Sequence, residues 1–434
     1  MKIKLNQRWA FIFLIVMAIM YLGIYFFEYN YPVQKIKKIY FADRMTTAHK
    51  ILIAEYNKLN AGKVEVVPVD FPNDDFSTNE RKEIVARSLR GLGDGIDIFA
   101  VDIIWVQRFA KWCEPLDKYF PEPEKNKILS EAMESCYFDG EMVAAPLYMV
   151  QSVMYYRKDL LEKMKNGDQI IKKVQDGLTW DEFISLDKKL NVKNPFYIFP
   201  GADYEGLICA FDEQLLSLKQ NYFEQNGFNF ETPEAEKTLQ LFHDLINKYK
   251  MSPSQITQFT EVPSYEYFIK NNGLFLWGWN SYDKDFKDTP YDLSKQNDLR
   301  KAPVPHFEGG KSTSILGGWD LMVSKFSDNK KEAVDFVKFL LKKQSQEIFY
   351  KKSAYYPVLK EFYRDSTFES NNSNVYDYKK YLMSGLHRPA NEEYTKYSKI
   401  MSYYFNRALS YKLSVKDALE KCTKAIQLDK IILK

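Results

Sequence analysis

The first part of the chain alternates short apolar runs with stretches in which apolar residues recur at helical spacing. The apolar runs cover residues 39–42, 64–69 and 96–101, and the second of them is rich in valine. The stretches 51–59 and 80–89, which separate these runs, have the helical spacing. Strands that alternate with helices indicate a largely parallel sheet with crossover connections. The pattern therefore predicts an α/β fold.

Helix-start signals also occur in the rest of the chain, so further helices are expected there. Thr179 and Glu182 have the spacing of a capping box, in which each side chain bonds the backbone of the other residue. A further helix is expected to begin near Asn329, and a last one after Ser414. About 400 residues follow the amino-terminal segment, which is enough for two domains of ordinary size.

The amino-terminal end has a different character. A basic end over 1–8 precedes an uncharged, mainly apolar stretch over 9–27. A helix of this length crosses a bilayer, and the positive flank predicts that the preceding residues stay in the cytoplasm. The sequence therefore predicts a single-pass signal anchor in the cell membrane over 9–27, a tether over 28–38 and an extracytoplasmic remainder.

Cleavage of the apolar segment is the alternative. A signal peptide has a short apolar core and a cleavage site of small residues. Here the core is long, and residues 23–28 are mostly bulky. No cysteine stands near the segment, which excludes a lipid-modified cysteine. Cleavage at an atypical site stays open.

Charge and composition limit the partners. The net charge is only +3 and is spread along the chain, so nothing resembles a stripe that binds nucleic acid. Aromatic residues make up 16% of the chain, which favours a carbohydrate ligand because tyrosine and tryptophan combine an apolar face with a polar tip. Cys113 and Cys136 would either pair in an oxidising compartment or stay as buried thiols.

A search for catalytic chemistry finds no signature. The four histidines form no metal-binding motif, and no serine lies in a Gly-x-Ser-x-Gly elbow. We therefore predict that the chain is not an enzyme and that it holds no metal or cofactor. A membrane-anchored glycosidase stays open as an alternative, because that chemistry needs only two carboxylates and the chain has many.

Several short segments occur in a fixed order along the chain, and this order identifies a protein family more specifically than any single segment does. Acidic, aromatic and proline-containing segments lie at 97–105, 114–117, 138–148, 154–160, 273–279, 302–305, 317–319, 355–357 and 388–389. In this order the chain resembles the family 1 extracellular solute-binding proteins, of the maltose- and trehalose-binding type. The resemblance covers nearly everything after the amino-terminal segment.

The resemblance implies a two-lobed, type II periplasmic-binding-protein-like fold that closes around an oligosaccharide. It also implies a monomer that delivers this ligand to the permease subunits of an ABC importer. Lobe 1 is expected at 39–145 plus 302–348, and lobe 2 at 146–301 plus 349–434. A two-lobed binding protein for a non-sugar ligand is the second alternative.

Five candidate ligand residues can be argued from the residues themselves. Asp102 follows an apolar strand, where open α/β sheets present ligands, and its carboxylate would accept bonds from sugar hydroxyls unless it caps a helix. Gly317 and Gly318 permit close backbone approach beside the stacking plane of Trp319, unless they form a tight turn. Trp279 would stack on a pyranose, unless it packs in the core.

The remaining candidates, taken from the resemblance, are Asp43, Arg44, Trp105, Tyr148, Tyr355 and Arg388. Tyr148 matches a tyrosine at the lobe junction of the family. Arg388 matches an arginine that bridges hydroxyls, with a surface or inter-lobe ion pair as the alternative. Val150 stands where related proteins tend to carry an acid, which leaves the identity of the sugar open.

Overall fold

The computed structural model describes residues 7–30, 36–71, 78–92, 95–285, 298–364 and 385–428. Its strands are β1 (Lys37–Asp43), β2 (Val64–Asp70), β3 (Ile98–Asp102), β4 (Tyr137–Phe138), β5 (Glu141–Met142), β6 (Ala145–Arg157), β7 (Tyr197–Ile198), β8 (Phe275–Trp279), β9 (Leu299–Ala302), β10 (Ser314–Val323) and β11 (Gly385–Leu386). The main sheet has the order β2-β1-β3-β10-β6-β8-β7. β1 runs parallel to β2 and β3, whereas β10 runs antiparallel to β3 and β6.

Helices accompany these strands as the sequence predicts. The longer ones are α1 (Gln7–Asn30), α2 (Thr47–Leu59), α3 (Thr78–Arg90), α8 (Gly167–Asp176), α9 (Trp180–Leu190), α10 (Glu205–Leu218), α12 (Pro233–Asn247), α13 (Glu261–Lys270), α16 (Lys330–Leu340), α17 (Lys343–Ser353), α20 (Tyr394–Leu409) and α21 (Val415–Gln427). The short ones are α4 (Val106–Phe109), α5 (Glu122–Lys125), α6 (Ser130–Met133), α7 (Lys158–Leu161), α11 (Tyr222–Asn226) and α14 (Tyr282–Asp285). The predicted α/β class is confirmed.

The predicted helix caps are present at two helix starts. The Thr179 hydroxyl accepts the backbone N–H of Glu182 at 3.2 Å, and the Glu182 carboxylate accepts the backbone N–H of Thr179 at 2.9 Å. Ser414 caps α21 by accepting the N–H of Asp417 at 3.0 Å. Asn329 precedes α16 as expected, although its side chain makes no capping bond.

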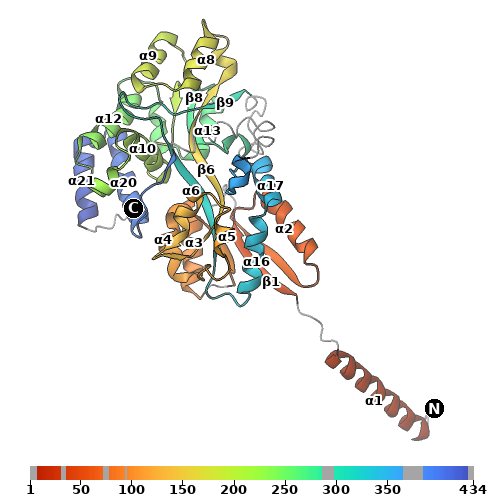
Figure 1. Cartoon of the computed structure of the whole chain (residues 1–434). Coiled ribbons are helices and arrows are strands. Elements are labelled where there is room, and N and C mark those ends of the chain that lie inside the picture. Colours follow the sequence, from red (N-terminus) through yellow and green to blue (C-terminus); the bar gives the residue numbers. More distant parts are fainter. Residues whose placement is uncertain are drawn as a thin grey trace, which may run out of the picture.

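Strand β6 takes part in two groups of strands. Its residues up to Gln151 pair with β10, and those from Ser152 onward pair with β8 and then with β9. β10 pairs with β3 through residues 319–323 and with β11 through 314–315. β6 and β10 therefore connect the two groups of strands, and Figure 1 shows β6 in the middle of the molecule.

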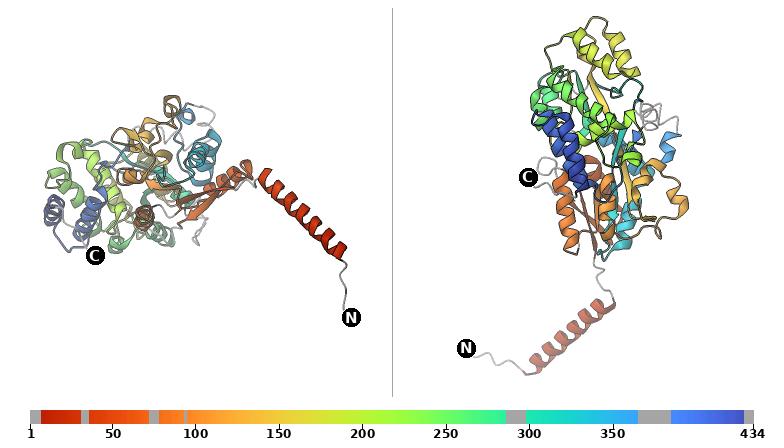
Figure 2. Two further views of the ribbon diagram at one scale, coloured as in Figure 1. Left: turned by 90° about the horizontal axis from the view of Figure 1, so that it is seen from below. Right: turned by 90° about the vertical axis from the view of Figure 1, so that its left-hand side faces the viewer.

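Hydrophobic cores lie on either side of this crossing. Lobe 1, as we name it here, is the part whose core takes side chains from 39–149 and 316–363, with Tyr394 packed against it. Lobe 2 is the part whose core takes side chains from 153–315 and 400–426. Figure 2 shows lobe 2, with its yellow, green and dark blue helices, above lobe 1 in the right-hand view.

The packing differs from the predicted lobe bounds in two places. Val304 and Phe307, placed by the sequence analysis in lobe 1, belong to the core of lobe 2. Phe349 and Phe362, placed in lobe 2, belong to the core of lobe 1. The reason is that the chain passes from the core of lobe 2 to that of lobe 1 within β10, between Ile315 and Leu316. It then contributes to the core of lobe 1 as far as Tyr363.

The amino-terminal helix α1 has large apolar side chains, from Trp9 to Leu22, that are exposed. A helix at this place is confirmed. Over the residues that the structure describes, however, no helix combines the length and the apolar character that a membrane span requires. The predicted transmembrane span is therefore not supported.

The cysteines are buried and free, so the alternative of a Cys113–Cys136 disulfide is not realised. Burial raises the pKa of both thiols well above the usual value. These thiols are therefore packing residues of lobe 1.

Each lobe also buries an acidic side chain. Glu213 in lobe 2 and Asp320 on β10 are each 1% exposed. Burial raises the pKa of each carboxyl to about 7, against the opposing effect of hydrogen bonds. Glu213 accepts the Ser152 hydroxyl at 2.5 Å and the Trp277 ring N–H at 2.8 Å.

These two carboxyls give the chain a pH-dependent stability. Between their unfolded pKa values, near 4, and the folded values of about 7, they hold protons that the unfolded chain has released. Their contribution to stability is therefore lost as the pH rises through about 7. Urea unfolding at a series of pH values measures this dependence, and we expect Glu213→Gln with Asp320→Asn to flatten it. An unaltered profile in the double variant would contradict the assignment.

Candidate functional site

Three predicted ligand residues lie side by side on neighbouring strands. Trp319 on β10 pairs with Asp102 at the end of β3 and, on its other side, with Tyr148 on β6. Residues paired directly across neighbouring strands project to the same face of a sheet. Tyr355 extends the row, because its ring stacks on that of Tyr148 with centroids 3.8 Å apart and an interplanar angle of 15°. The register and this stacking thus bring together four residues that are distant in sequence.

Aromatic and cationic groups surround Trp319, which is half-buried. The buried ring of Trp105 meets it edge-on, with centroids 6.4 Å apart. The Arg81 guanidinium carbon lies 4.6 Å from the centroid of the Trp319 ring, and the Lys82 ammonium lies 5.0 Å from that of Trp105. Both distances are typical of cation–π contacts. Helix α3 therefore brings two cations onto this aromatic pair.

Arg81 and Lys82 are site residues that the sequence analysis missed. Both side chains are buried, and burial lowers the pKa of Lys82 to about 8 and that of Arg81 below its usual value. A usable signal was present, since Arg81, Val85 and Leu89 recur every four residues and so share one helix face. An arginine on the core-facing side of a helix indicates a special environment.

Arg388 joins acidic groups from both lobes. One guanidinium nitrogen donates to Asp102 at 2.8 Å, and the other donates to Glu205, at the start of α10, at 2.7 Å. Although burial alone lowers the pKa of Arg388, Asp102 and other neighbours raise it well above the usual value. Glu205 also accepts the hydroxyls of Tyr394 and Ser398. The inter-lobe ion pair, the stated alternative for Arg388, is therefore present, and a contact with ligand stays a prediction.

Of the two roles considered for Asp102, the helix cap is present, and contact with a ligand stays a prediction. Besides binding Arg388, its carboxylate accepts the N–H of Ile104 at 3.1 Å and so caps the short helical turn that follows β3. The side chain is 15% exposed. It therefore keeps a limited surface for a ligand.

Asp43 and Arg44 lie at the end of β1. The Asp43 carboxylate is buried, accepts the N–H of Arg44 at 2.6 Å and lies 3.1 Å from the ring nitrogen Nε2 of His49. Arg44 is half-buried, and both residues interact electrostatically with Arg81. They are thus near the row, while a direct role in binding stays a prediction.

Gly317 and Gly318 lie within β10 and not in a turn. A Cβ on Gly317 would stand 3.1 Å from the ring of Trp279, so this half-buried tryptophan lies against the glycine. A Cβ on Gly318 would stand 2.5 Å from the carbonyl oxygen of Tyr148. The close approach that Gly318 permits is therefore that of β6, which holds Tyr148 next to Trp319.

The Gly318→Ala substitution is expected to destabilise the chain by a few kcal/mol, since the clash is with backbone that cannot move aside without breaking β6–β10 pairing. Gly62→Ala is the control. Gly62 has a φ of +78° but nothing within 4 Å of its Cβ position, so the cost there is conformational, about 1 kcal/mol. Urea unfolding of both variants measures the difference, and equal losses would refute the clash.

Metal ligation finds no support in this part of the molecule. Among the described residues, no group of three or more His, Cys, Asp or Glu side chains is arranged to hold a metal ion. The residues around Trp319 offer aromatic planes, a carboxylate and guanidinium groups, which suit a ligand rich in hydroxyls.

The chain is similar to known proteins over much of its length. Residues 39–347 match the family described as bacterial extracellular solute-binding protein. A probable ABC transporter-binding protein of Deinococcus radiodurans is 26% identical over 298 residues, covering 66% of this chain and 68% of the relative. An arabinooligosaccharide-binding protein of Halalkalibacterium halodurans is 23% identical over 251 residues, covering 54% and 53% respectively.

A solved structure extends the similarity to the fold. The maltose-bound MalE3 of T. maritima superimposes with a TM-score of 0.79 and 26% sequence identity. The match covers 90% of this chain and 99% of that protein. The two-lobed binding-protein fold is therefore confirmed.

Proposed function

The chain belongs to the bacterial extracellular solute-binding protein family, and we propose that its solute is an oligosaccharide held between lobes 1 and 2. The observation that carries this proposal is the row Asp102–Trp319–Tyr148–Tyr355 beside the strands that join the lobes. Trp319 supplies a stacking plane, and the carboxylate and hydroxyls supply hydrogen-bonding groups. The sugar ligands named for two of the similar proteins support the same class.

The proposed mechanism is binding and closure. Lobes 1 and 2 hinge about β6 near Gln151 and Ser152 and about β10, where both strands change partners. Closure desolvates the sugar and presents the complex to the permease subunits of an ABC importer. We propose that the chain acts as a monomer and carries out no chemistry on its ligand.

Calorimetric titration with maltotriose, arabinotriose and xylotriose tests this function. We expect at least one of them to bind, and a ligand at 100 times its Kd to raise the free energy of unfolding by about 2.7 kcal/mol. Chromatography of the recovered sugar separates a binding protein from a glycosidase, because only the glycosidase shortens it. Failure of a broad panel of neutral oligosaccharides to bind would overturn the proposal.

We further propose that α1 holds the extracytoplasmic chain at a membrane. The support is the uncharged sequence over 9–27 and the exposed side chains such as Trp9, Phe11 and Leu22. Deleting residues 1–35 should move the protein from the membrane fraction to the soluble fraction while leaving sugar affinity unchanged. Recovery of the full chain in the soluble fraction, or equal fractionation of the two forms, would contradict the anchor.

A further inference from the structure

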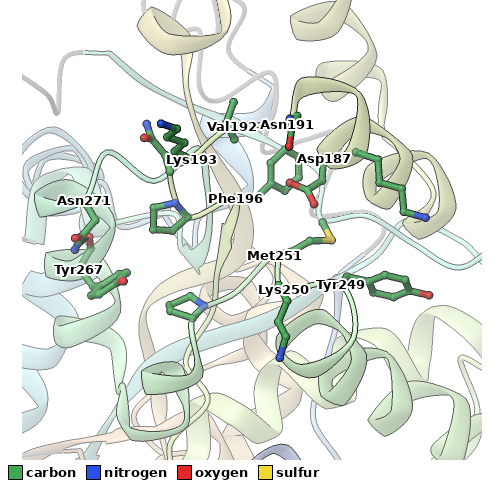
Figure 3. Close-up of a pocket in the computed structure, with 14 residues that line it drawn as sticks. Asp187, Asn191, Val192, Lys193, Phe196, Tyr249, Lys250, Met251, Tyr267 and Asn271 are labelled. Carbon is green, nitrogen blue, oxygen red and sulfur yellow. Dashed lines mark hydrogen bonds between the residues drawn. The ribbon is translucent and has the colours of Figure 1, made fainter.

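Lobe 2 contains a hollow that is lined by none of the residues of the row Asp102–Trp319–Tyr148–Tyr355. It has a volume of about 690 Å³ and is bordered by residues 187–188, 191–196, 249–251, Pro253, Tyr267 and Asn271. This volume falls in the range of small-molecule sites. Figure 3 shows Asp187 and Asn191 on one side of the hollow, Tyr267 and Asn271 on the other, and Phe196 with Met251 between them.

The polar groups of the hollow are rich in acceptors. The side-chain amides of Asn194 and Asn271 donate to the carbonyl oxygens of Asn272 and Tyr267, at 3.0 and 2.9 Å. Within the described chain, neither amide oxygen accepts a bond, and the Asp187 carboxylate takes part in no hydrogen bond or ion pair. Asp187 is half-buried, and burial raises the pKa of its carboxyl while Lys188 lowers it.

Three helices end at this hollow. α9 ends at Leu190 and α13 at Lys270, each directly before a residue that lines it, and α12 ends at Asn247, two residues before Tyr249. The carboxyl end of a helix carries a partial negative charge, and cations are stabilised there. The convergence of three such ends adds to the negative charge of Asp187.

The lysines that line the hollow do not form an ion pair with Asp187 in the described chain. The Lys188 ammonium lies over the ring of Tyr249, 5.7 Å from its centroid. Lys250 points away from Asp187, and Lys193 lies on the far side of the hollow from it (Figure 3). The three lysines and Asn271 are exposed, whereas Asp187 is half-buried.

We propose that this hollow is a second ligand site, separate from the inter-lobe cleft, for a small organic molecule with a primary ammonium group. The ammonium would donate to Asp187, and a donor at the other end of the molecule would reach the amide oxygens of Asn194 and Asn271. The apolar part of the molecule would lie against Phe196 and Met251. The proposal does not depend on the identity of the sugar in the cleft.

Calorimetric titration of the full chain with 1,4-diaminobutane tests the proposal, with 1,4-butanediol as an uncharged probe of the same length. We expect the diamine to bind and the diol not to. Asp187→Asn should weaken diamine binding by at least about tenfold, because a charge-assisted bond is lost. Asp176→Asn, which removes an exposed acid paired with Lys172 on α8, should leave the affinity unchanged.

Two further results decide the assignment. Trp319→Ala should leave diamine binding unaltered, which separates this site from the cleft. The thermal unfolding midpoint of Asp187→Asn should equal that of the parent, since the carboxylate makes no bond within the described chain. Absent diamine binding, equal binding of the diol, or equal affinity in Asp187→Asn and Asp176→Asn would each overturn the proposal.

Discussion

Replacing Arg388 by alanine is expected to lower the free energy of unfolding by about 3 kcal/mol, the lower end of the cost of breaking a buried ion pair. The Arg388 side chain is 1% exposed and bonds Asp102 and Glu205. Without it, two carboxylates would face each other without their shared counter-charge. They are 15% and 17% exposed, so water partly solvates them, which limits the loss.

Urea unfolding of Arg388→Ala, Arg388→Lys and Arg108→Ala measures this effect. Arg108 pairs with Glu83 at 3.3 Å, with side chains 27% and 49% exposed, so its removal should cost no more than about 1 kcal/mol. Arg388→Lys should fall between the other two, because an ammonium lacks the planar fork that reaches both carboxylates. A loss in Arg388→Ala no larger than that in Arg108→Ala would show that the ion pair contributes little.

The local pattern of lobe 1 was predictable because each element has a complete signal of its own. β1, β2 and β3 are short apolar runs, and α2 and α3 have helical spacing. The capping box at Thr179 likewise depends only on residues within one turn. Such signals need no knowledge of what the element packs against.

The arrangement of the site was not predictable, because it depends on strand register. β10 enters the sheet between β3 and β6 and runs antiparallel to both. A shift of one residue would turn Trp319 to the opposite face of the sheet. The sequence identified Asp102, Tyr148 and Trp319 separately, and only the register makes them neighbours.

The residues that escaped prediction are those whose role depends on a partner in the other part of the chain. Glu205 begins a helix and has no local motif, yet it shares Arg388 with Asp102. Arg81 was readable as a charge on an apolar helix face, but its position over Trp319 was not. Lobe bounds were displaced for the same reason, since β10 belongs to both groups of strands.

Replacing Trp319 by alanine is expected to weaken oligosaccharide binding by about 30-fold, which corresponds to about 2 kcal/mol. This loss is the expected cost of truncating an aromatic residue at the centre of a site. Trp319 is central by register, between Asp102 and Tyr148. Arg81 covers part of its ring in the structure, so a stacking sugar would have to share or displace that contact.

Calorimetry with the best-binding oligosaccharide compares Trp319→Ala, Trp319→Phe and Trp112→Ala. Phenylalanine keeps a smaller plane and should lose less affinity than alanine. Trp112 is half-buried in the same lobe but packs against Phe109, outside the row, so its removal should leave Kd unchanged.

Arg81→Ala tests the contact in which Arg81 covers the ring of Trp319. If Arg81 competes with the sugar for the ring, its removal tightens binding, whereas a residue that contacts the sugar weakens binding on removal. Unchanged affinity in Trp319→Ala would show that the sugar does not stack on Trp319, and the row would then not be the ligand site.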